Sequence, residues 1–441
     1  MIDQPFVVYE GGRPLPGTRL IARSLAAHPR RPREAASIHM ELSSLSTGAV
    51  SSIGLVVRTL IVVSVGLLVT ACVSSRTISA TVSAPLAPLP AALDTTWYVS
   101  ARGRDQGRDT RRLVDPDSLE YGLVVYHRRP MDDAFTSAIQ LRLVDSVQLT
   151  RLDFEASLAA RRDVTADTSG VTVLYVHGFG TSLHEGWQYA AEARVRSHHP
   201  ARWVVFCWPA NGLGLSWPRS RALFSTAYHD DTELASASRR ALARAMQSVL
   251  AAIHPSQVIL ASHSLGARVV GAALTNDFPL QAVLVRHPLR AMAFFTPDVE
   301  SSWFSDSILP AARGIARRVL LYTSGRDRVL AMARQINNSE RAGLRSTDPM
   351  VRPGLETVDV TDGVVAEGWL TARVGTHHAI RRASAALFDL THVVGGGFTA
   401  DCRRVIGTAR VAASGVWQLT TQRPPLAIGE GVCGKDESLP Q

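Results

Sequence analysis

The chain has 441 residues, enough for one large domain with appendages at its ends. Hydrophobic residues make up 46% of the sequence, which excludes an intrinsically disordered chain. The formal net charge is +9, but the arginines that supply it are scattered along the sequence. Since they form no basic stripe and accompany no nucleic-acid-binding module, we expect no nucleic-acid partner.

Residues 1–71 have the pattern of an export signal with a preceding segment. Within residues 53–71, Arg58 is followed by an apolar core and a small-residue end, as in a secretory signal. The ending Val-Thr-Ala-Cys resembles a bacterial lipobox, in which Cys72 is lipidated and becomes the first residue of the mature chain. We therefore expect a membrane-anchored lipoprotein of the cell envelope, exported from the cytoplasm. A single transmembrane helix is the alternative, although Arg58 interrupts it, and Met40 is an alternative start of translation.

Residues 72–93 are rich in serine, alanine, threonine and proline and are expected to form a tether. Three strand-like segments then predict an antiparallel start to a sheet: residues 96–99, 121–126 and 140–144. Beyond them, apolar runs of β character alternate with helical patterns, which favours an α/β fold with a mostly parallel sheet flanked by helices. The first of these elements are a strand at 171–176, a helix at 183–197, a strand at 203–207 and a helix at 231–252.

The strand at 171–176 ends in the sequence His-Gly-Phe-Gly-Thr-Ser, which begins at His177. In one class of hydrolytic site, a His-Gly loop after a central strand supplies a backbone amide that binds a developing oxyanion. We expect the amide of Phe179 to have this role. His177 itself is expected to be structural.

A second motif follows the apolar strand at 258–261. The sequence Ser-His-Ser-Leu-Gly, with Ser264 at its centre, lies between this strand and a helical run, the setting of a nucleophile elbow. Such a turn requires small residues two positions before and after the nucleophile, and Ser262 and Gly266 satisfy this. Ser264 is therefore the candidate nucleophile. The Leu265 amide at the start of the helix is the second candidate oxyanion donor.

The remaining strands bring candidate acids and a candidate base in the order that such a catalytic triad requires. A strand at 290–295 precedes Asp298, a clearer strand at 318–323 precedes Asp327, and a weaker one at 355–360 precedes the pair His377-His378. We expect His377 to take the proton of Ser264 and Asp327 to hold the imidazole tautomer. Asp298 and His378 are the rival acid and base. Asp327 could instead simply cap a helix that begins at Arg328.

The four cysteines have separate expected roles. Cys207 lies in an apolar strand and is expected to be a buried thiol. Cys402 and Cys433 lie in the C-terminal tail, residues 395–441, and an exported chain permits a disulfide between them. Without paired CxxC motifs, spaced His/Asp clusters or a glycine-rich phosphate loop, the sequence predicts neither a metal site nor a cofactor.

Seven motifs together resemble bacterial α/β-hydrolases of unknown function, which are esterase- or lipase-like and often lipoproteins. They are HGFGTS at His177, FCWPANG at Phe206, YHDD at Tyr228, ASHSLG at Ala261, TPDVESSWF at Thr296, YTSGRDRVL at Tyr322 and THHAI at Thr376. The family's histidine precedes a helix with Asp-Leu, here Asp389-Leu390, and this spacing favours His377 over His378. The chain departs from the family pattern in the residue types at Gly180, Ala210 and Thr376.

The resemblance implies an α/β-hydrolase fold over residues 94–394, with the C-terminal extension after it. It also implies a serine hydrolase of the carboxylesterase or lipase type, which cleaves a lipid or small-molecule ester through an acyl-enzyme. The alternative is a catalytically silent envelope lipoprotein that uses the fold for binding. The natural substrate and the oligomeric state are left open, and acyl transfer or peptide cleavage would use the same triad.

Overall fold

A computed structural model describes residues 9–10, 13–14, 93–128, 141–160, 170–211, 221–276, 278–345, 349–363, 377, 383–421 and 423–436. By its internal contacts the chain divides into two units, residues 1–74 and 75–441, and each is described by itself. In the first unit, β1 (Tyr9–Glu10) pairs with β2 (Arg13–Pro14) in antiparallel orientation. The predicted signal segment 53–71, Cys72 and nearly all of the predicted tether lie outside the described residues.

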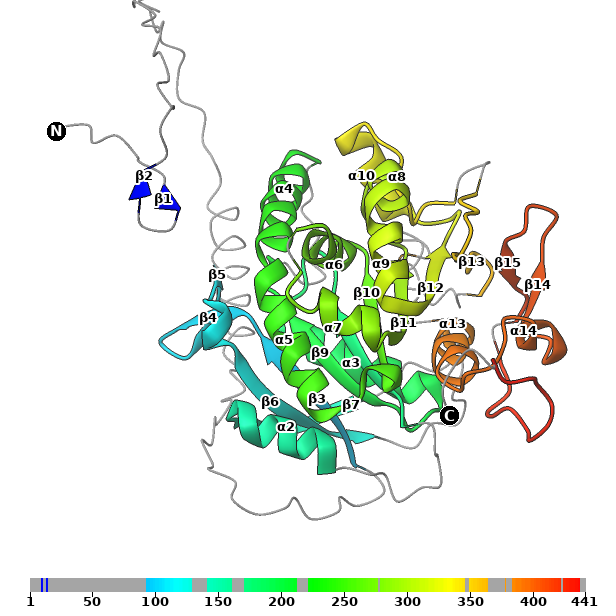
Figure 1. The fold of residues 1–441 in the computed structure, drawn as a ribbon, viewed down its shortest axis with the longest axis horizontal. Coiled ribbons are helices and arrows are strands. Elements are labelled where there is room, and N and C mark those ends of the chain that lie inside the picture. Colours follow the sequence, from blue (N-terminus) through cyan, green and yellow to red (C-terminus); the bar gives the residue numbers. More distant parts are fainter. Residues whose placement is uncertain are drawn as a thin grey trace, which may run out of the picture. The chain divides into compact units, whose positions relative to one another are not determined.

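The second unit is built on an eleven-stranded sheet of order β14-β15-β13-β12-β11-β10-β8-β9-β3-β6-β7 (Figure 1). Its strands are β3 (Leu93–Ser100), β6 (Glu120–Arg128), β7 (Leu141–Leu149), β8 (Thr172–Val176), β9 (Arg202–Cys207), β10 (Val258–His263), β11 (Leu289–Phe295), β12 (Ala316–Thr323), β13 (Glu356–Asp359), β14 (Ala409–Val411) and β15 (Trp417–Leu419). All neighbours from β3 to β15 are parallel, whereas β6 and β7 at one end and β14 at the other pair antiparallel. A separate hairpin joins β4 (Arg102–Asp105) to β5 (Arg108–Leu113).

Helices cover both faces of this sheet. Those of five or more residues are α2 (Arg151–Ala160), α3 (Leu183–Ser197), α4 (Arg221–Ala237), α5 (Arg239–Ala252), α6 (Gly266–Thr275), α7 (Gln281–Arg286), η3 (Phe304–Ile308), α9 (Leu309–Ile315), α10 (Arg328–Asn337), α13 (Ser384–Phe388) and η4 (Asp389–Val394). The short ones are η1 (Pro116–Ser118), η2 (Pro255–Gln257), α8 (Ser301–Trp303) and α14 (Cys402–Val405). The expected fold, a mostly parallel sheet flanked by helices, is confirmed.

Two hydrophobic clusters form the core, one on each face of the sheet. Alternate residues of β10 face opposite sides, so that Leu260 joins one cluster and Ile259 and Ala261 join the other. The first cluster packs α2, α5, α6 and α9 against the sheet, and the second packs α3 and α13. Because both faces are covered, the central strands are buried along their whole length.

The helix expected at 231–252 differs from the structure. It begins ten residues earlier as α4 and is divided from α5 at Ser238. The Ser238 hydroxyl donates a hydrogen bond to the carbonyl of Leu234 at 2.7 Å, four residues back in the chain. This back-bonding is a known cause of bends in helices.

The described part of the C-terminal tail is joined to the sheet. β15 lies beside β13 in parallel orientation, and β14 forms the edge (Figure 1). A disulfide links Cys402 to Cys433, as the sequence permits. The fully buried Arg403 forms ion pairs with Asp389 and Glu356, so this segment packs on the same domain.

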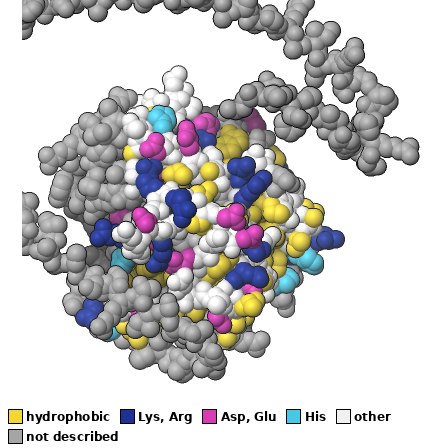
Figure 2. All heavy atoms as spheres, turned by 90° about the vertical axis from the view of Figure 1, so that its left-hand side faces the viewer, with side chains coloured by type: hydrophobic (Ala, Val, Ile, Leu, Met, Phe, Trp, Pro, Cys, Tyr) yellow, Lys and Arg dark blue, Asp and Glu magenta, His cyan; other side chains and the backbone are white. Residues whose placement is uncertain are grey.

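The surface carries charges of both signs. On the face drawn in Figure 2, arginine and lysine side chains are interspersed with aspartate and glutamate. Among the residues that the structure describes, no helix has the length and apolar character needed to cross a membrane.

Candidate active site

Ser264 lies in a tight turn at the carboxyl end of β10, in the middle of the sheet. Its φ of +51° is in the left-handed region, where a residue with a side chain is strained by about 1–3 kcal/mol. Neighbouring strand ends hold the turn: the Ser264 amide donates to the Phe295 carbonyl, and the Asp298 amide donates to the Ser264 carbonyl, both at 3.0 Å. The side chain is buried, and its hydroxyl makes no hydrogen bond within the described part of the chain.

Two glycines allow the His-Gly loop to lie directly against this turn. A Cβ on Gly266 would lie 2.4 Å from the His177 carbonyl oxygen and 2.5 Å from that of Val176. A Cβ on Gly178 would lie 3.0 Å from the Ser264 Cβ. The two predicted motifs are therefore in close contact, and neither glycine position has room for a side chain.

His177 holds the loop through contacts with Trp208 and Gly178. It is fully buried and stacks on Trp208, whose indole nitrogen donates to the His177 carbonyl at 2.8 Å. Its Nδ1 lies 3.0 Å from the carbonyl oxygen of Gly178, which can only accept, so Nδ1 carries the proton. Burial lowers the pKa of His177 to about 3, so the ring is neutral. These contacts fit the structural role expected from the sequence.

The structure brings His377 and Asp327 together. Nδ1 of His377 lies 2.8 Å from Oδ2 of Asp327, and both side chains are buried. Asp327 follows β12 and is also the N-cap of α10, because its Oδ1 accepts a hydrogen bond from the Leu330 amide at 2.9 Å. The pairing with His377 and the helix cap are therefore both present. The rival base, His378, lies outside the described residues.

His263, the residue directly before the candidate nucleophile, links the elbow to the His377 segment. Its Nε2 lies 2.7 Å from the His377 carbonyl oxygen, and the two rings are 4.8 Å apart. The Thr296 hydroxyl donates to the same carbonyl at 3.2 Å. The histidine segment is thus held against the ends of β10 and β11.

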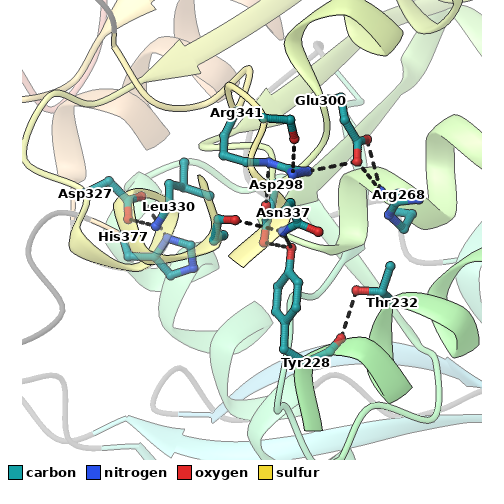
Figure 3. A network of polar contacts seen from close by, with 12 residues as sticks. Tyr228, Thr232, Arg268, Asp298, Glu300, Asp327, Leu330, Asn337, Arg341 and His377 are labelled. Carbon is teal, nitrogen blue, oxygen red and sulfur yellow. Dashed lines mark hydrogen bonds and ion pairs between the residues drawn. The ribbon is translucent and has the colours of Figure 1, made fainter. Parts of the chain in front are cut away.

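The rival acid, Asp298, has other partners (Figure 3). The Tyr228 hydroxyl donates to its Oδ2 at 2.9 Å, and Nε of Arg341 lies 3.0 Å from its Oδ1. Burial raises the pKa of Asp298, although Arg341 and the Tyr228 hydroxyl oppose this. Arg341 also reaches Glu300 at 3.4 Å, and Glu300 pairs with Arg268. Asp298 therefore belongs to a buried ionic network beside the candidate site.

The two candidate oxyanion donors belong to segments that meet at Ser264. Leu265 follows the serine directly and is the N-cap residue of α6. Phe179 lies in the His-Gly loop, with its ring 5.9 Å from that of Tyr228. Gly180 follows at φ +64°, a conformation that glycine and asparagine adopt most readily. Glycine therefore suits this position of the loop. Within the described ranges, no group of three metal-ligating side chains occurs.

Comparison with known proteins gives a family but no function. Residues 153–367 match the model of a family described as an alpha/beta hydrolase of unknown function. No curated protein matches the chain. The chain is similar to the solved structure of esterase PE8, at 16% identity and a TM-score of 0.24, over 46% of this chain and 90% of that one.

It is also similar to a predicted CIB-like hydrolase from Thermoplasma acidophilum, at 12% identity and a TM-score of 0.26. That likeness covers 60% of this chain and 99% of the other. The family expected from the sequence, the α/β-hydrolases of unknown function, is confirmed over residues 153–367.

Proposed function

We propose that this chain is a serine hydrolase that cleaves ester bonds through Ser264, His377 and Asp327. The observation that carries the proposal is the 2.8 Å contact between Asp327 and the Nδ1 of His377. This contact joins two residues that lie 50 positions apart in the sequence. His263 connects the same histidine segment to the turn at Ser264. A strained serine, a buried histidine and a carboxylate that orients it are the elements of nucleophilic catalysis.

In the proposed reaction, the imidazole of His377 takes the proton of the Ser264 hydroxyl as Oγ attacks the ester carbonyl. Asp327 accepts the Nδ1 proton of His377 in a hydrogen bond, which leaves Nε2 unprotonated and able to act as the base. The amides of Leu265 and Phe179 stabilise the oxyanion, a contribution of about 3–4 kcal/mol per donor in such sites. His377 then returns the proton to the leaving alcohol, and a water molecule activated by His377 releases the acid. A hydrogen bond between serine and histidine often tightens only when substrate binds.

A fluorophosphonate probe followed by peptide mapping tests this proposal without knowledge of the substrate. We expect one labelled peptide that contains Ser264, and loss of the label in Ser264→Ala. Ser262→Ala is the matched control, since Ser262 is also buried and lies two residues before the turn. Labelling that persists in Ser264→Ala would refute the assignment. If the protein neither reacts with the probe nor hydrolyses p-nitrophenyl butyrate, a catalytically silent binding protein is the better interpretation.

We further propose that the enzyme acts at the bacterial cell envelope, anchored through lipid on Cys72. The signal-like segment 53–71 and the lipobox-like ending support this, and the disulfide between Cys402 and Cys433 is compatible with an oxidising compartment. A multiply acylated cysteine would anchor the protein stably, whereas one chain would not. The substrate would then be an ester of a lipid or of another hydrophobic compound at the membrane surface.

Metabolic labelling with an alkyne palmitate analogue tests the anchor. We expect Cys72→Ser to abolish the label and the lipoprotein-type cleavage. Cys207→Ser is expected to keep both, because that thiol is buried inside the sheet. If both the parent and Cys72→Ser remain in the membrane with residues 53–71 uncleaved, the segment is a transmembrane helix instead.

A further inference from the structure

Asp231 is a buried carboxylate on α4 that joins two loops at the carboxyl edge of the sheet. Its Oδ2 accepts hydrogen bonds from the backbone amides of Gly180 and Asn211, each at 3.0 Å. Its Oδ1 lies 3.3 Å from a guanidinium nitrogen of Arg111, on β5. Gly180 follows β8 and Asn211 follows β9, so one side chain connects the ends of two neighbouring strands.

The contact with Gly180 lies next to a candidate oxyanion donor. The Gly180 amide belongs to the peptide group that begins with the carbonyl of Phe179, so fixing this amide restricts the backbone on which the Phe179 amide is presented. Tyr228, three residues before Asp231 and on the same face of α4, packs its ring against the Phe179 ring at 5.9 Å. Its hydroxyl binds Asp298, whose own amide donates to the Ser264 carbonyl. One face of α4 therefore contacts the His-Gly loop directly and is linked to the Ser264 turn through Asp298.

An ordinary role in helix stability does not account for Asp231. It lies eleven residues into α4, which begins at Arg221, so its carboxylate does not cap the helix. Burial of a carboxylate is costly unless partners compensate it. Burial raises the pKa of Asp231. The hydrogen bonds from the two backbone amides oppose that rise, and so do the charges of Arg111 and Arg102. The compensation thus comes mainly from the amides of the two loops.

Arg102 also binds the second of these loops. Its buried guanidinium donates to the carbonyls of Trp208 and Ala210, the residues just before Asn211. Asp231 accepts from the amides and Arg102 donates to the carbonyls, so the polar backbone groups at these strand ends have charged partners.

We propose that Asp231 is a positioning residue that holds the His-Gly loop so that the Phe179 amide can bind the oxyanion. The inference rests on the proposed function and extends it to a residue that does not touch the substrate. Its effect should therefore appear in kcat more than in KM, because the oxyanion forms only in the transition state.

The test compares variants of the full chain in the hydrolysis of p-nitrophenyl butyrate. Asp231→Ala should lower kcat by about 10- to 100-fold, less than outright loss of an oxyanion donor, with KM changed by less than about threefold. Asp231→Asn should stay within about threefold of the parent in kcat, because an amide oxygen can still accept both hydrogen bonds. Asp230→Ala is the matched control, since Asp230 adjoins Asp231 and reaches Arg111 at 3.5 Å but is exposed.

Two safeguards keep the result interpretable. If Asp231→Ala does not fold, Asp231→Ser replaces it. The serine hydroxyl is too short to reach both amides, so this variant should show the same loss of kcat. A folded Asp231→Ala or Asp231→Ser with the parent's kcat would overturn the inference. So would equal losses of kcat in Asp231→Ala and Asp230→Ala.

Hydrogen exchange of the Gly180 amide separates this inference from the proposed function. If the parent reacts with neither the ester nor the fluorophosphonate probe, the proposed function is refuted, but the positioning of the loop is not. Faster exchange at Gly180 in Asp231→Ala would then still support the positioning of the loop, whereas unchanged exchange would refute that as well.

Discussion

Asp327 uses its two carboxylate oxygens for two different tasks, and one of them is to bind His377. Oδ2 lies 2.8 Å from Nδ1 of the imidazole, while Oδ1 accepts the Leu330 amide at 2.9 Å. The start of α10 therefore fixes the orientation of the carboxylate that in turn orients His377. An acid held at both oxygens has little freedom to rotate, which favours a single imidazole orientation.

Asp327→Asn separates these two tasks. Its amide oxygen can replace Oδ1 as the helix cap, but the amide nitrogen would then face Nδ1 of His377 and favour the wrong tautomer. We expect kcat to fall by about 10⁴-fold while the free energy of unfolding changes by less than about 1 kcal/mol. Ester hydrolysis and denaturant unfolding measure the two effects. If Asp298→Asn caused the larger loss of kcat, Asp298 would be the acid.

The base is tested in the same assay. We expect His377→Ala to abolish turnover, because it removes the imidazole that Asp327 orients. His378→Ala should keep most of the activity, since the spacing to Asp389-Leu390 favours the first histidine. The opposite result would exchange the two assignments.

The sequence predicted the parts of this site that have local signals. Buried strands appear as apolar runs, and the turn at Ser264 requires small neighbours, so β8, β10, β11 and β12 were placed to within two residues. Asp327 was predicted from its place after β12, both as an acid and as a cap.

The parts that were missed depend on contacts between distant segments. His263 binds the carbonyl of a residue 114 positions away, and Asp231 binds an amide 51 positions away. No periodicity or turn pattern encodes such contacts. The strands at the C-terminal edge have only three residues each, too few to show an alternating pattern. The burial of Arg341 has no signal in the sequence, because an isolated arginine is normally exposed.

The buried ion pair of Arg341 and Asp298 should matter for stability more than for chemistry. Asp298→Asn would leave Arg341 with the partly exposed Glu300 as its ion-pair partner, and loss of one partner of a buried pair costs about 3–5 kcal/mol. Glu300→Gln is the control, because Glu300 is partly exposed and its pairs should contribute less than about 1 kcal/mol. Denaturant unfolding should rank the two variants in this order, and a smaller loss for Asp298→Asn would contradict the network's role.

Gly266→Ala should damage both the fold and the site. The added Cβ would lie within 2.5 Å of two carbonyl oxygens and push the His-Gly loop away from the elbow. We expect a loss of about 3 kcal/mol in unfolding free energy, as in overpacked cores, together with loss of fluorophosphonate labelling. Gly314→Ala in α9 is the control, because its Cβ meets no atom within 4 Å. That change should be neutral or stabilising by up to about 1 kcal/mol.

His177 should make the folded state sensitive to acid. Burial lowers its pKa from 6.5 to about 3, so between these values the unfolded chain binds a proton that the folded chain does not. The stability that this neutral ring contributes is therefore fully present above pH 6.5, and it declines as the pH falls towards the folded pKa. The slope from this residue alone is at most about 1.4 kcal/mol per pH unit. His177→Asn removes the titrating group yet can still donate to the Gly178 carbonyl. The change in unfolding free energy between about pH 5 and about pH 7.5 should be smaller in this variant than in the parent, by about 2 kcal/mol. An equal change in both proteins would show that the folded protein tolerates a protonated His177.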